Sequence, residues 1–97
     1  MIKHIVTFKL KGSSEEKNEI ARRFAEALIQ LPDEIEELKS IEVGLNVNPA
    51  ENWDIVLTAT ADSLEDIAVY SAHPAHQAAV KIIAPYKEER ACVDYSV

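Results

Sequence analysis

The sequence predicts an α+β fold with the element order β-α-β-β-α-β, and two kinds of periodicity support this prediction. Apolar and polar residues alternate with the period of two that is typical of strands in four segments, at residues 2–10, 41–47, 53–61 and 90–97. Apolar residues recur at helical spacing in two further segments, at residues 14–31 and 63–83. Each half of the chain therefore reads as a β-α-β unit.

The first strand and the first helix have clear boundaries in the sequence. Residues 2–10 alternate without interruption, and Ser13 and Glu16 then have the spacing of a capping box, which marks a helix start. Apolar residues continue at helical spacing and predict one helix over residues 14–31. Pro32 is expected to end this helix because it lacks a backbone N–H and its ring clashes with the preceding turn.

The second half of the chain contains a hairpin and an interrupted helix. A loop rich in Asn and Pro joins the second and third strands, which favours an antiparallel pair. A helical segment then begins near Ser63. The pair His73-Pro74 interrupts it, because a residue before proline avoids the helical region and proline suits the first position of a new helix. We expect two short helices and a last strand, at residues 63–71, 74–83 and 90–97.

This order is the ferredoxin-like plan, an antiparallel sheet with its helices on one face. A chain of 97 residues is expected to form one domain, residues 1–97, and its 47% of apolar residues suffices for a modest core.

One cysteine cannot form an internal disulfide, and no apolar run is long enough to span a membrane. The net charge of −7 argues against nucleic acid as a partner. The strand-like start is unlike a signal peptide, so we expect a cytoplasmic protein.

The two faces of the predicted sheet differ in character. One face is strongly apolar and is expected to meet the helices; it collects Ile2, Val6, Phe8, Leu10, Ile41, Val43, Leu45, Val47, Trp53, Ile55, Leu57, Val93 and Tyr95. The opposite face is too apolar to be fully solvated and too polar for a core, which favours self-association. We expect a homodimer through this face, with Ile5, Thr7, Val56, Thr58 and Cys92 in the interface; a solvated Thr/Val face is the alternative.

Three histidines are the residues most able to carry chemistry. His4 lies in an otherwise apolar column of the first strand, where a histidine is more often a satisfied core or edge residue. His76 lies in the first turn of the last predicted helix, where the positive end of the helix dipole disfavours imidazolium and keeps the ring available as a general base. Tyr70, just before the helix break, is positioned to point its hydroxyl into the same space. The structural alternative is that His73 caps the helix and His76 lies on the surface.

The spacing of His73 and His76 also occurs in metal sites. Zinc needs at least a third protein ligand, and the proline between the two rings breaks the helical register, so we expect no metal there. Cys92 is expected to behave as a small apolar residue, since nothing in its surroundings favours a reactive thiolate. Neither a phosphate-binding glycine loop nor a nucleotide fingerprint is present.

Several segments of the chain resemble one protein family over nearly its whole length. They are Met1 to Leu10, Ile41-Glu42-Val43-Gly44, Trp53-Asp54-Ile55-Val56-Leu57, Tyr70-Ser71-Ala72-His73-Pro74-Ala75-His76 and Val93-Asp94-Tyr95. In these the chain resembles the stress-responsive A/B barrel domain (Dabb) family. The resemblance implies a dimeric α+β barrel in which two subunits pack sheet against sheet.

The resemblance also implies a site. The family includes stress-induced plant proteins and a cofactor-free plant polyketide cyclase, olivetolic acid cyclase, whose pocket lies between sheet and helices. The tyrosine and histidine of that pocket match Tyr70 and His76, and the N-terminal histidine of the family matches His4. A further pocket histidine of the cyclase falls at Ile55, which is a departure from its pattern. His73 is a signature position that we interpret as structural. The resemblance implies no cofactor.

Two functional hypotheses follow. The chain is a stress-related or small-ligand-binding protein, or it is a cofactor-independent cyclase or lyase acting on a small apolar or polyketide-like substrate through His76, Tyr70 and His4. The second hypothesis requires these three side chains to converge on a cavity large enough for a small ligand. If Phe8, Phe24 and Trp53 fill the space instead, the first is favoured.

Overall fold

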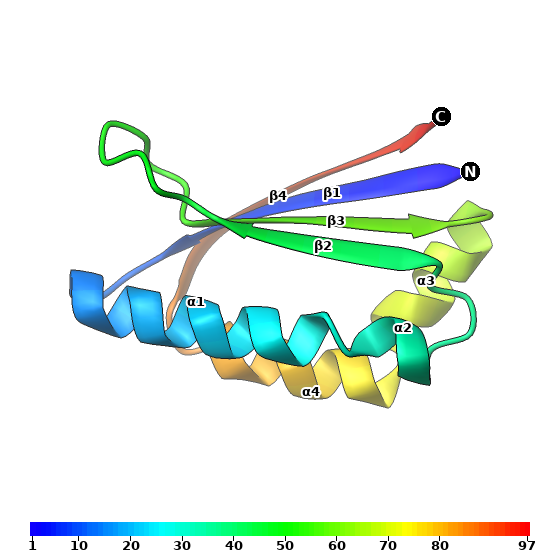
Figure 1. Ribbon diagram of the computed structural model, residues 1–97, viewed down its shortest axis with the longest axis horizontal. Helices are drawn as coiled ribbons and strands as arrows, with labels where there is room; N and C mark the ends of the chain where they lie inside the picture. Colours follow the sequence, from blue (N-terminus) through cyan, green and yellow to red (C-terminus); the bar gives the residue numbers. More distant parts are fainter.

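The computed structural model describes residues 1–97 and contains one four-stranded antiparallel sheet with the strand order β2-β3-β1-β4. All helices lie on the same face of this sheet, as Figure 1 shows. This is the ferredoxin-like architecture that the sequence predicts. The elements are β1 (Ile2–Leu10), α1 (Ser14–Leu28), α2 (Leu31–Glu34), β2 (Ser40–Leu45), β3 (Ile55–Ala61), α3 (Leu64–Ala72), α4 (Pro74–Ile83) and β4 (Lys87–Ser96).

Side-chain caps fix where the helices begin. The Ser13 hydroxyl accepts the Glu16 N–H and the Glu16 carboxylate accepts the Ser13 N–H, so the predicted capping box of α1 is confirmed. The Ser63 hydroxyl accepts the backbone N–H of Asp66 at the start of α3. His73 ends α3 in an extended conformation and caps α4 through its ring, and Pro74 is the first residue of α4.

Helical structure between residues 14 and 34 is divided, so the expectation of one helix over residues 14–31 is wrong at its end. The α1 helix stops at Leu28, and a separate turn, α2, begins at Leu31. Pro32 explains the break, because it has no N–H to donate to the carbonyl of Leu28 and so cannot continue the helical ladder.

The strands also differ from the predicted ranges at their ends. The hairpin strands β2 and β3 are each two residues shorter than expected at the loop that joins them. Asn46 and Asn48 explain this, because their side-chain oxygens accept the backbone N–H groups of Asn48 and Ala50 and so offer the chain an alternative to the ladder. Val47, expected on the helix-facing side, is 95% exposed in this loop. Strand β4 begins at Lys87, three residues earlier than expected.

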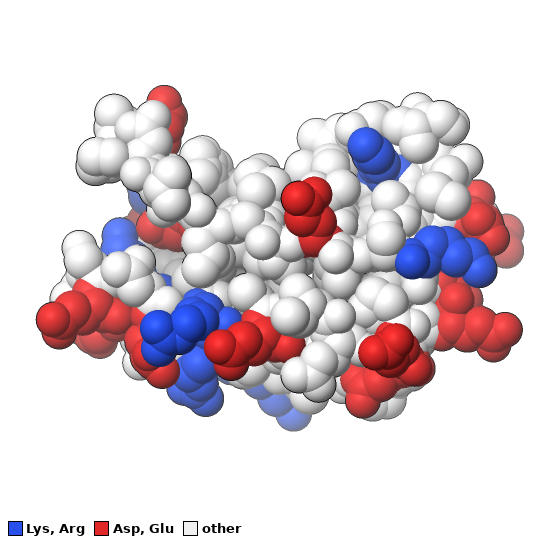
Figure 2. Space-filling model, in the orientation of Figure 1, with Lys and Arg blue, Asp and Glu red and all other residues white.

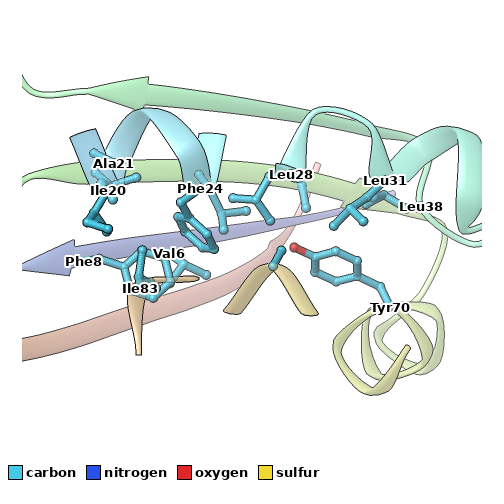
Figure 3. Packing of buried hydrophobic residues seen from close by; sticks show 14 of the residues in the cluster. Val6, Phe8, Ile20, Ala21, Phe24, Leu28, Leu31, Leu38, Tyr70 and Ile83 are labelled. Carbon is cyan, nitrogen blue, oxygen red and sulfur yellow. The ribbon is translucent and has the colours of Figure 1, made fainter. Parts of the chain in front are cut away.

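The core lies between the sheet and the helices. Phe8 of β1 and Phe24 of α1 meet edge to face, with ring centroids 5.4 Å apart. Leu28, Ile35 and Leu38 extend the cluster toward the far end of the sheet, and all three are buried. Figure 3 shows this packing, with Phe24 of α1 next to Val6 and Phe8 of β1, and Tyr70 reaching in at the end where Leu31 and Leu38 lie.

The register between β1 and β4 corrects the prediction for the last strand. Val6 pairs with Cys92, and residues directly opposite each other in an antiparallel pair project to the same face. Because Val6 faces the helices, Cys92 faces them too, and Val93 and Tyr95 project to the outer face. The expectation that Cys92 lies in the outer face and that Val93 and Tyr95 meet the helices is therefore wrong.

The outer face of the sheet carries Lys3, Lys9, Glu42 and Glu89 as well as uncharged side chains. Val56, Val93 and Tyr95 are large apolar side chains exposed on it, with Val93 62% exposed. Figure 2 shows that Lys, Arg, Asp and Glu gather over the helices in the lower half of the view, whereas the sheet side above carries few. Trp53, expected on the helix-facing side, is 37% exposed and lines a hollow of about 340 Å³ with the outer-face residues Thr7 and Val56. None of the helices is both long enough and apolar enough to cross a membrane.

Candidate functional site

His4 is the only polar or charged residue in the buried part of the chain, with 6% of its surface exposed. It lies on the helix-facing side of β1, opposite Asp94 of β4 in the register. Its Nδ1 lies 2.5 Å from Oδ1 of Asp94. An ionised carboxylate can only accept a hydrogen bond, so Nδ1 carries the hydrogen. The neutral ring then has its lone pair on Nε2, which has no partner in the protein.

The ring of His76 is also held by a hydrogen bond from its Nδ1, but the acceptor is a backbone carbonyl instead of a carboxylate. Its Nδ1 donates to the backbone carbonyl of Ser71, 2.9 Å away, across the break between α3 and α4. Nε2 of the neutral ring again carries the lone pair. Burial lowers the pKa of His76 below its ordinary value; the bond to Ser71 opposes this, and the neighbouring His4 and Arg90 add to it. The lowered pKa favours the neutral form of the ring near pH 7.

Tyr70 contacts both histidines through its ring and not through its hydroxyl. Its ring centroid lies 4.5 Å from that of His76 and 6.0 Å from that of His4, which it meets edge-on. Its hydroxyl is fully buried and has no hydrogen-bond partner. In Figure 3 the oxygen points into the apolar cluster. Burial raises the pKa of Tyr70 far above its usual range, and the charge of Arg90 offsets only part of this shift.

One mostly enclosed cavity is lined by both histidines, and Tyr70 is not part of its lining. Its volume is about 60 Å³, which corresponds to roughly two water molecules at ~30 Å³ each. Part of its wall is apolar, and two cations, Lys87 and Arg90 of β4, also line it. The complete lining is His4, Val6, Phe8, Leu57, Ser71, His76, Val80, Lys87 and Arg90.

The remaining predicted residues have other positions. His73 accepts the Ala75 N–H at its Nδ1, 3.0 Å away, as expected of a structural residue holding the turn before Pro74. The two rings bond to different backbone groups, His73 to the Ala75 N–H and His76 to the Ser71 carbonyl. Phe8 lines the cavity, whereas Phe24 and Ile55 are buried in the surrounding core. Trp53 lies on the other side of the sheet.

Sequence reasoning missed the partners of the histidines. Asp94, Arg90 and Cys92 reach the site because they alternate along β4 on its helix-facing side. The alternation of residues 90–96 indicates a strand with two different faces. Each of the two sets of alternating residues was, however, assigned to the wrong face of the sheet. Ser71 acts through its backbone carbonyl, which leaves no signal in the sequence.

Comparison with known proteins gives a consistent result. The sequence pattern of the family described as stress responsive A/B barrel domain matches residues 2–97. An uncharacterised protein of Streptomyces coelicolor is 30% identical over 83 residues, which are 84% of this chain and 86% of the relative.

Two crystal structures are similar to this chain in both sequence and fold. A dimeric protein of unknown function with a ferredoxin-like fold from Bacteroides fragilis is 49% identical, with a TM-score of 0.97 over 99% of this chain and 95% of that one. A dimeric ferredoxin-like protein of unknown function from Thermobifida fusca is 32% identical, with a TM-score of 0.81 over 99% of this chain and 90% of that one.

Proposed function

Since the chain belongs to the stress-responsive A/B barrel domain family, we propose that it is a homodimer that binds a small substrate under its helices and transfers a proton on it. The observation that carries the proposal is that two histidine rings, each anchored through Nδ1, line one enclosed cavity. Anchoring through Nδ1 leaves Nε2 of both rings free for a ligand. A purely structural histidine would not need its second nitrogen unpaired beside a cavity.

The cavity wall defines the class of substrate. Val6, Phe8 and Leu57 favour an apolar body, while Arg90 and Lys87 favour a carboxylate or a carbonyl oxygen that becomes negative during the reaction. A volume of about 60 Å³ admits only the reacting end of such a molecule. We therefore propose a small apolar compound with a carbonyl group and an anionic group, such as a 2-oxo acid.

The proposed step is removal of a proton from the carbon next to the carbonyl. Nε2 of His76 forms the new N–H bond, the C–H bond breaks, and its electron pair moves onto the carbonyl oxygen. The guanidinium of Arg90, which makes no ion pair within the protein, stabilises the resulting oxyanion. His4 is the second proton-transfer group, because its ring lines the same cavity and is anchored through Nδ1 on Asp94.

Tyr70 has a different part in this proposal from the one the sequence suggests. Its ring packs against both histidines and holds their planes, so we assign it to positioning. Its hydroxyl becomes a donor only to a substrate atom that reaches past His76, because nothing within the protein contacts it.

Hydrogen exchange in D₂O tests the proposal directly. We would screen 2-oxo acids with short alkyl or phenyl chains by thermal shift, since a ligand that binds the native state raises the melting temperature. For compounds that bind, NMR then measures deuterium incorporation at the carbon beside the carbonyl. We expect His76→Gln to slow exchange by about 10²–10⁴-fold, the range for loss of a general base, with little change in melting temperature.

Two arginine substitutions show whether substrate binding depends on the cation at the cavity or on the total charge of the protein. Arg90→Gln removes a cavity cation and should weaken substrate binding, whereas Arg22→Gln removes a cation on the outer surface of α1 and should not. Exchange that survives in both His76→Gln and His4→Gln would overturn the proposal.

We place the dimer interface on the outer face of the sheet, where Ile5, Thr7, Val56 and Thr58 remain as predicted and Val93 and Tyr95 replace Cys92. The dimeric relatives support a dimer, and the exposed apolar side chains support this placement. Val56→Lys together with Val93→Lys should give a monomer in light scattering at micromolar concentration. Lys81→Glu on α4 is the control. A double variant that stays dimeric would place the interface elsewhere.

The family description supports a role in stress, and we extend the proposal to a cytoplasmic protein that increases under stress. Quantifying the protein in the cytoplasmic fraction before and after heat or oxidant treatment tests this extension. An unchanged amount would argue against the stress role and would leave the cavity chemistry to its own test.

A further inference from the structure

Three metal-ligating side chains meet at His4, which also lines the histidine cavity. Nδ1 of His4 lies 3.5 Å from Sγ of Cys92 and 2.5 Å from Oδ1 of Asp94, and Sγ lies 4.0 Å from the same oxygen. All three candidate ligand atoms fall within 4.8 Å of one another. They are a borderline nitrogen, a soft sulfur and a hard oxygen, the donor types found together on zinc.

The sheet holds these three ligands in place. Cys92 and Asp94 are two residues apart on β4 and therefore project to the same face, and His4 lies directly opposite Asp94 on β1. Eight consecutive register pairs, from Ile2–Ser96 to Lys9–Glu89, fix the two strands against each other. Ligands carried by paired strands are positioned more precisely than ligands on loops.

The distances fit a single ion. Zinc binds nitrogen and carboxylate oxygen at about 2.0–2.2 Å and sulfur at about 2.3 Å. A point between atoms separated by 2.5, 3.5 and 4.0 Å can lie at such distances from all three. The Asp94 side chain is 33% exposed and is free to turn slightly, which opens its short contact with His4 to the spacing of two ligands on one ion.

We propose that His4, Cys92 and Asp94 form a binding site for one divalent transition-metal ion of the zinc class. The three protein ligands leave a fourth position for water, reached from the exposed side of Asp94. Binding releases the thiol proton of Cys92 to solvent, because the thiolate is the ligand. The imidazole hydrogen of His4 moves from Nδ1 to Nε2, so that Nδ1 can bind the ion.

This transfer changes what His4 offers to the cavity. Without the ion, Nε2 of His4 is an acceptor; with the ion bound at Nδ1, Nε2 carries a hydrogen and is a donor. The site is thus a means of regulating the histidine pair, and this consequence alone rests on the proposed function. The metal site itself stands on the three ligands and is measured without any substrate.

Cobalt(II) gives the most direct test, because a thiolate bound to Co²⁺ has a charge-transfer absorption in the near ultraviolet. Cys92 is the sole cysteine of the chain, so such a band in the untagged protein can come from no other residue. We expect the band to saturate at one Co²⁺ per chain and to disappear when Zn²⁺ is added. We also expect Zn²⁺ to raise the melting temperature.

Substitutions distinguish this site from other histidine and acidic groups. Cys92→Ala should abolish the Co²⁺ band, and Asp94→Asn should weaken Zn²⁺ binding by at least ~10-fold. The controls His76→Gln and Asp62→Asn should bind as the parent protein does. Circular dichroism checks folding, and Cys92→Ser provides a polar replacement of similar volume should Cys92→Ala be unstable. Absence of the band in the parent protein, or unchanged Zn²⁺ affinity in Cys92→Ser and Asp94→Asn, would overturn the proposal.

Discussion

The two β-α-β halves of the molecule use their helices in different ways. In the first half, α1 is an uninterrupted helix of 15 residues whose buried side chains are all apolar: Ile20, Ala21, Phe24 and Leu28. In the second half, the helical segment breaks at His73-Pro74 into α3 and α4, and the break brings Tyr70 and His76 into contact. The first half stabilises the fold and contributes His4, and the second half contributes most of the candidate site.

The difference shows that an interrupted helix provides something a continuous helix cannot. At the break, the carbonyl of Ser71 accepts from the ring of His76 instead of from a backbone N–H four residues later. A backbone group released by the break thus fixes a functional side chain. The same break leaves the Tyr70 hydroxyl without a partner, whereas the first half buries no unpaired side-chain polar atom.

The largest effect is expected in the first half. Phe24→Ala removes a fully buried ring that meets Phe8 and leaves a cavity, so it should lower the free energy of unfolding by about 3–5 kcal/mol. Urea unfolding measures this loss. Ala25→Gly in the same helix is a control for helix propensity and should cost about 1 kcal/mol. A loss below that of the control would mean that α1 is not the main support of the core.

The next largest effect is an increase in stability, and it is expected from a substitution in the second half. Tyr70→Phe keeps the ring contacts with both histidines and removes a buried hydroxyl that has no partner, so it should raise stability by about 1–3 kcal/mol. Tyr95→Phe, on the exposed outer face, should be neutral. Chemical unfolding of both variants compares them. A destabilised Tyr70→Phe would show that the hydroxyl has a bound partner in solution.

Helix caps allow the two halves to be compared by the same substitution. Ser13→Ala and His73→Ala each remove a side chain that accepts a backbone N–H at a helix start, and each should cost about 1 kcal/mol. The His73 variant should also slow substrate hydrogen exchange, because His73 fixes the helix that carries His76. Equal effects of the two variants on exchange would contradict the assignment of the site to the second half.

The smallest expected effect is a dependence of stability on pH. Burial lowers the pKa of His76 in the folded protein, so the unfolded chain binds its proton more readily. The stability tied to the neutral ring is fully present above the ordinary pKa of about 6.5 and is lost as pH falls from there through the folded pKa. The loss should stay below about 1 kcal/mol, because the ring is partly exposed.

Unfolding in urea at several pH values between neutral and mildly acidic measures this dependence. His76→Gln should reduce the slope, since glutamine does not titrate. An identical slope in the variant would show that other groups cause the dependence.

Much of the fold could be predicted because it depends on local sequence patterns. The alternation of β1, the capping box at Ser13 and the break at His73-Pro74 each depend on a few neighbouring residues, and the range expected for α4 is confirmed. The end of α1 was missed because apolar spacing continues to Leu31 although the backbone ladder does not.

The site could be predicted only in part, for a physical reason. The histidines were visible as unusual residues in apolar settings, but their partners depend on the register between the first and the last strand. That register joins residues about 90 positions apart and cannot be read from either strand alone. The faces of β4 were assigned wrongly because the assignment followed side-chain polarity. Val93 and Tyr95 are more apolar than Cys92 and Asp94 but face outward.

Strand β4 lies at an edge of the sheet, and its alternation has a consequence for how the protein responds to concentration. Arg90, Cys92 and Asp94 project to one side of this strand, and Val93 and Tyr95 project to the other. A neighbour that restrains the outer side chains restrains the same backbone that positions the inner ones. With the proposed interface and the proposed ligand site, association and ligand occupancy would be linked equilibria, each favouring the other to the same extent. Dilution would loosen the inner side chains without any change to their sequence.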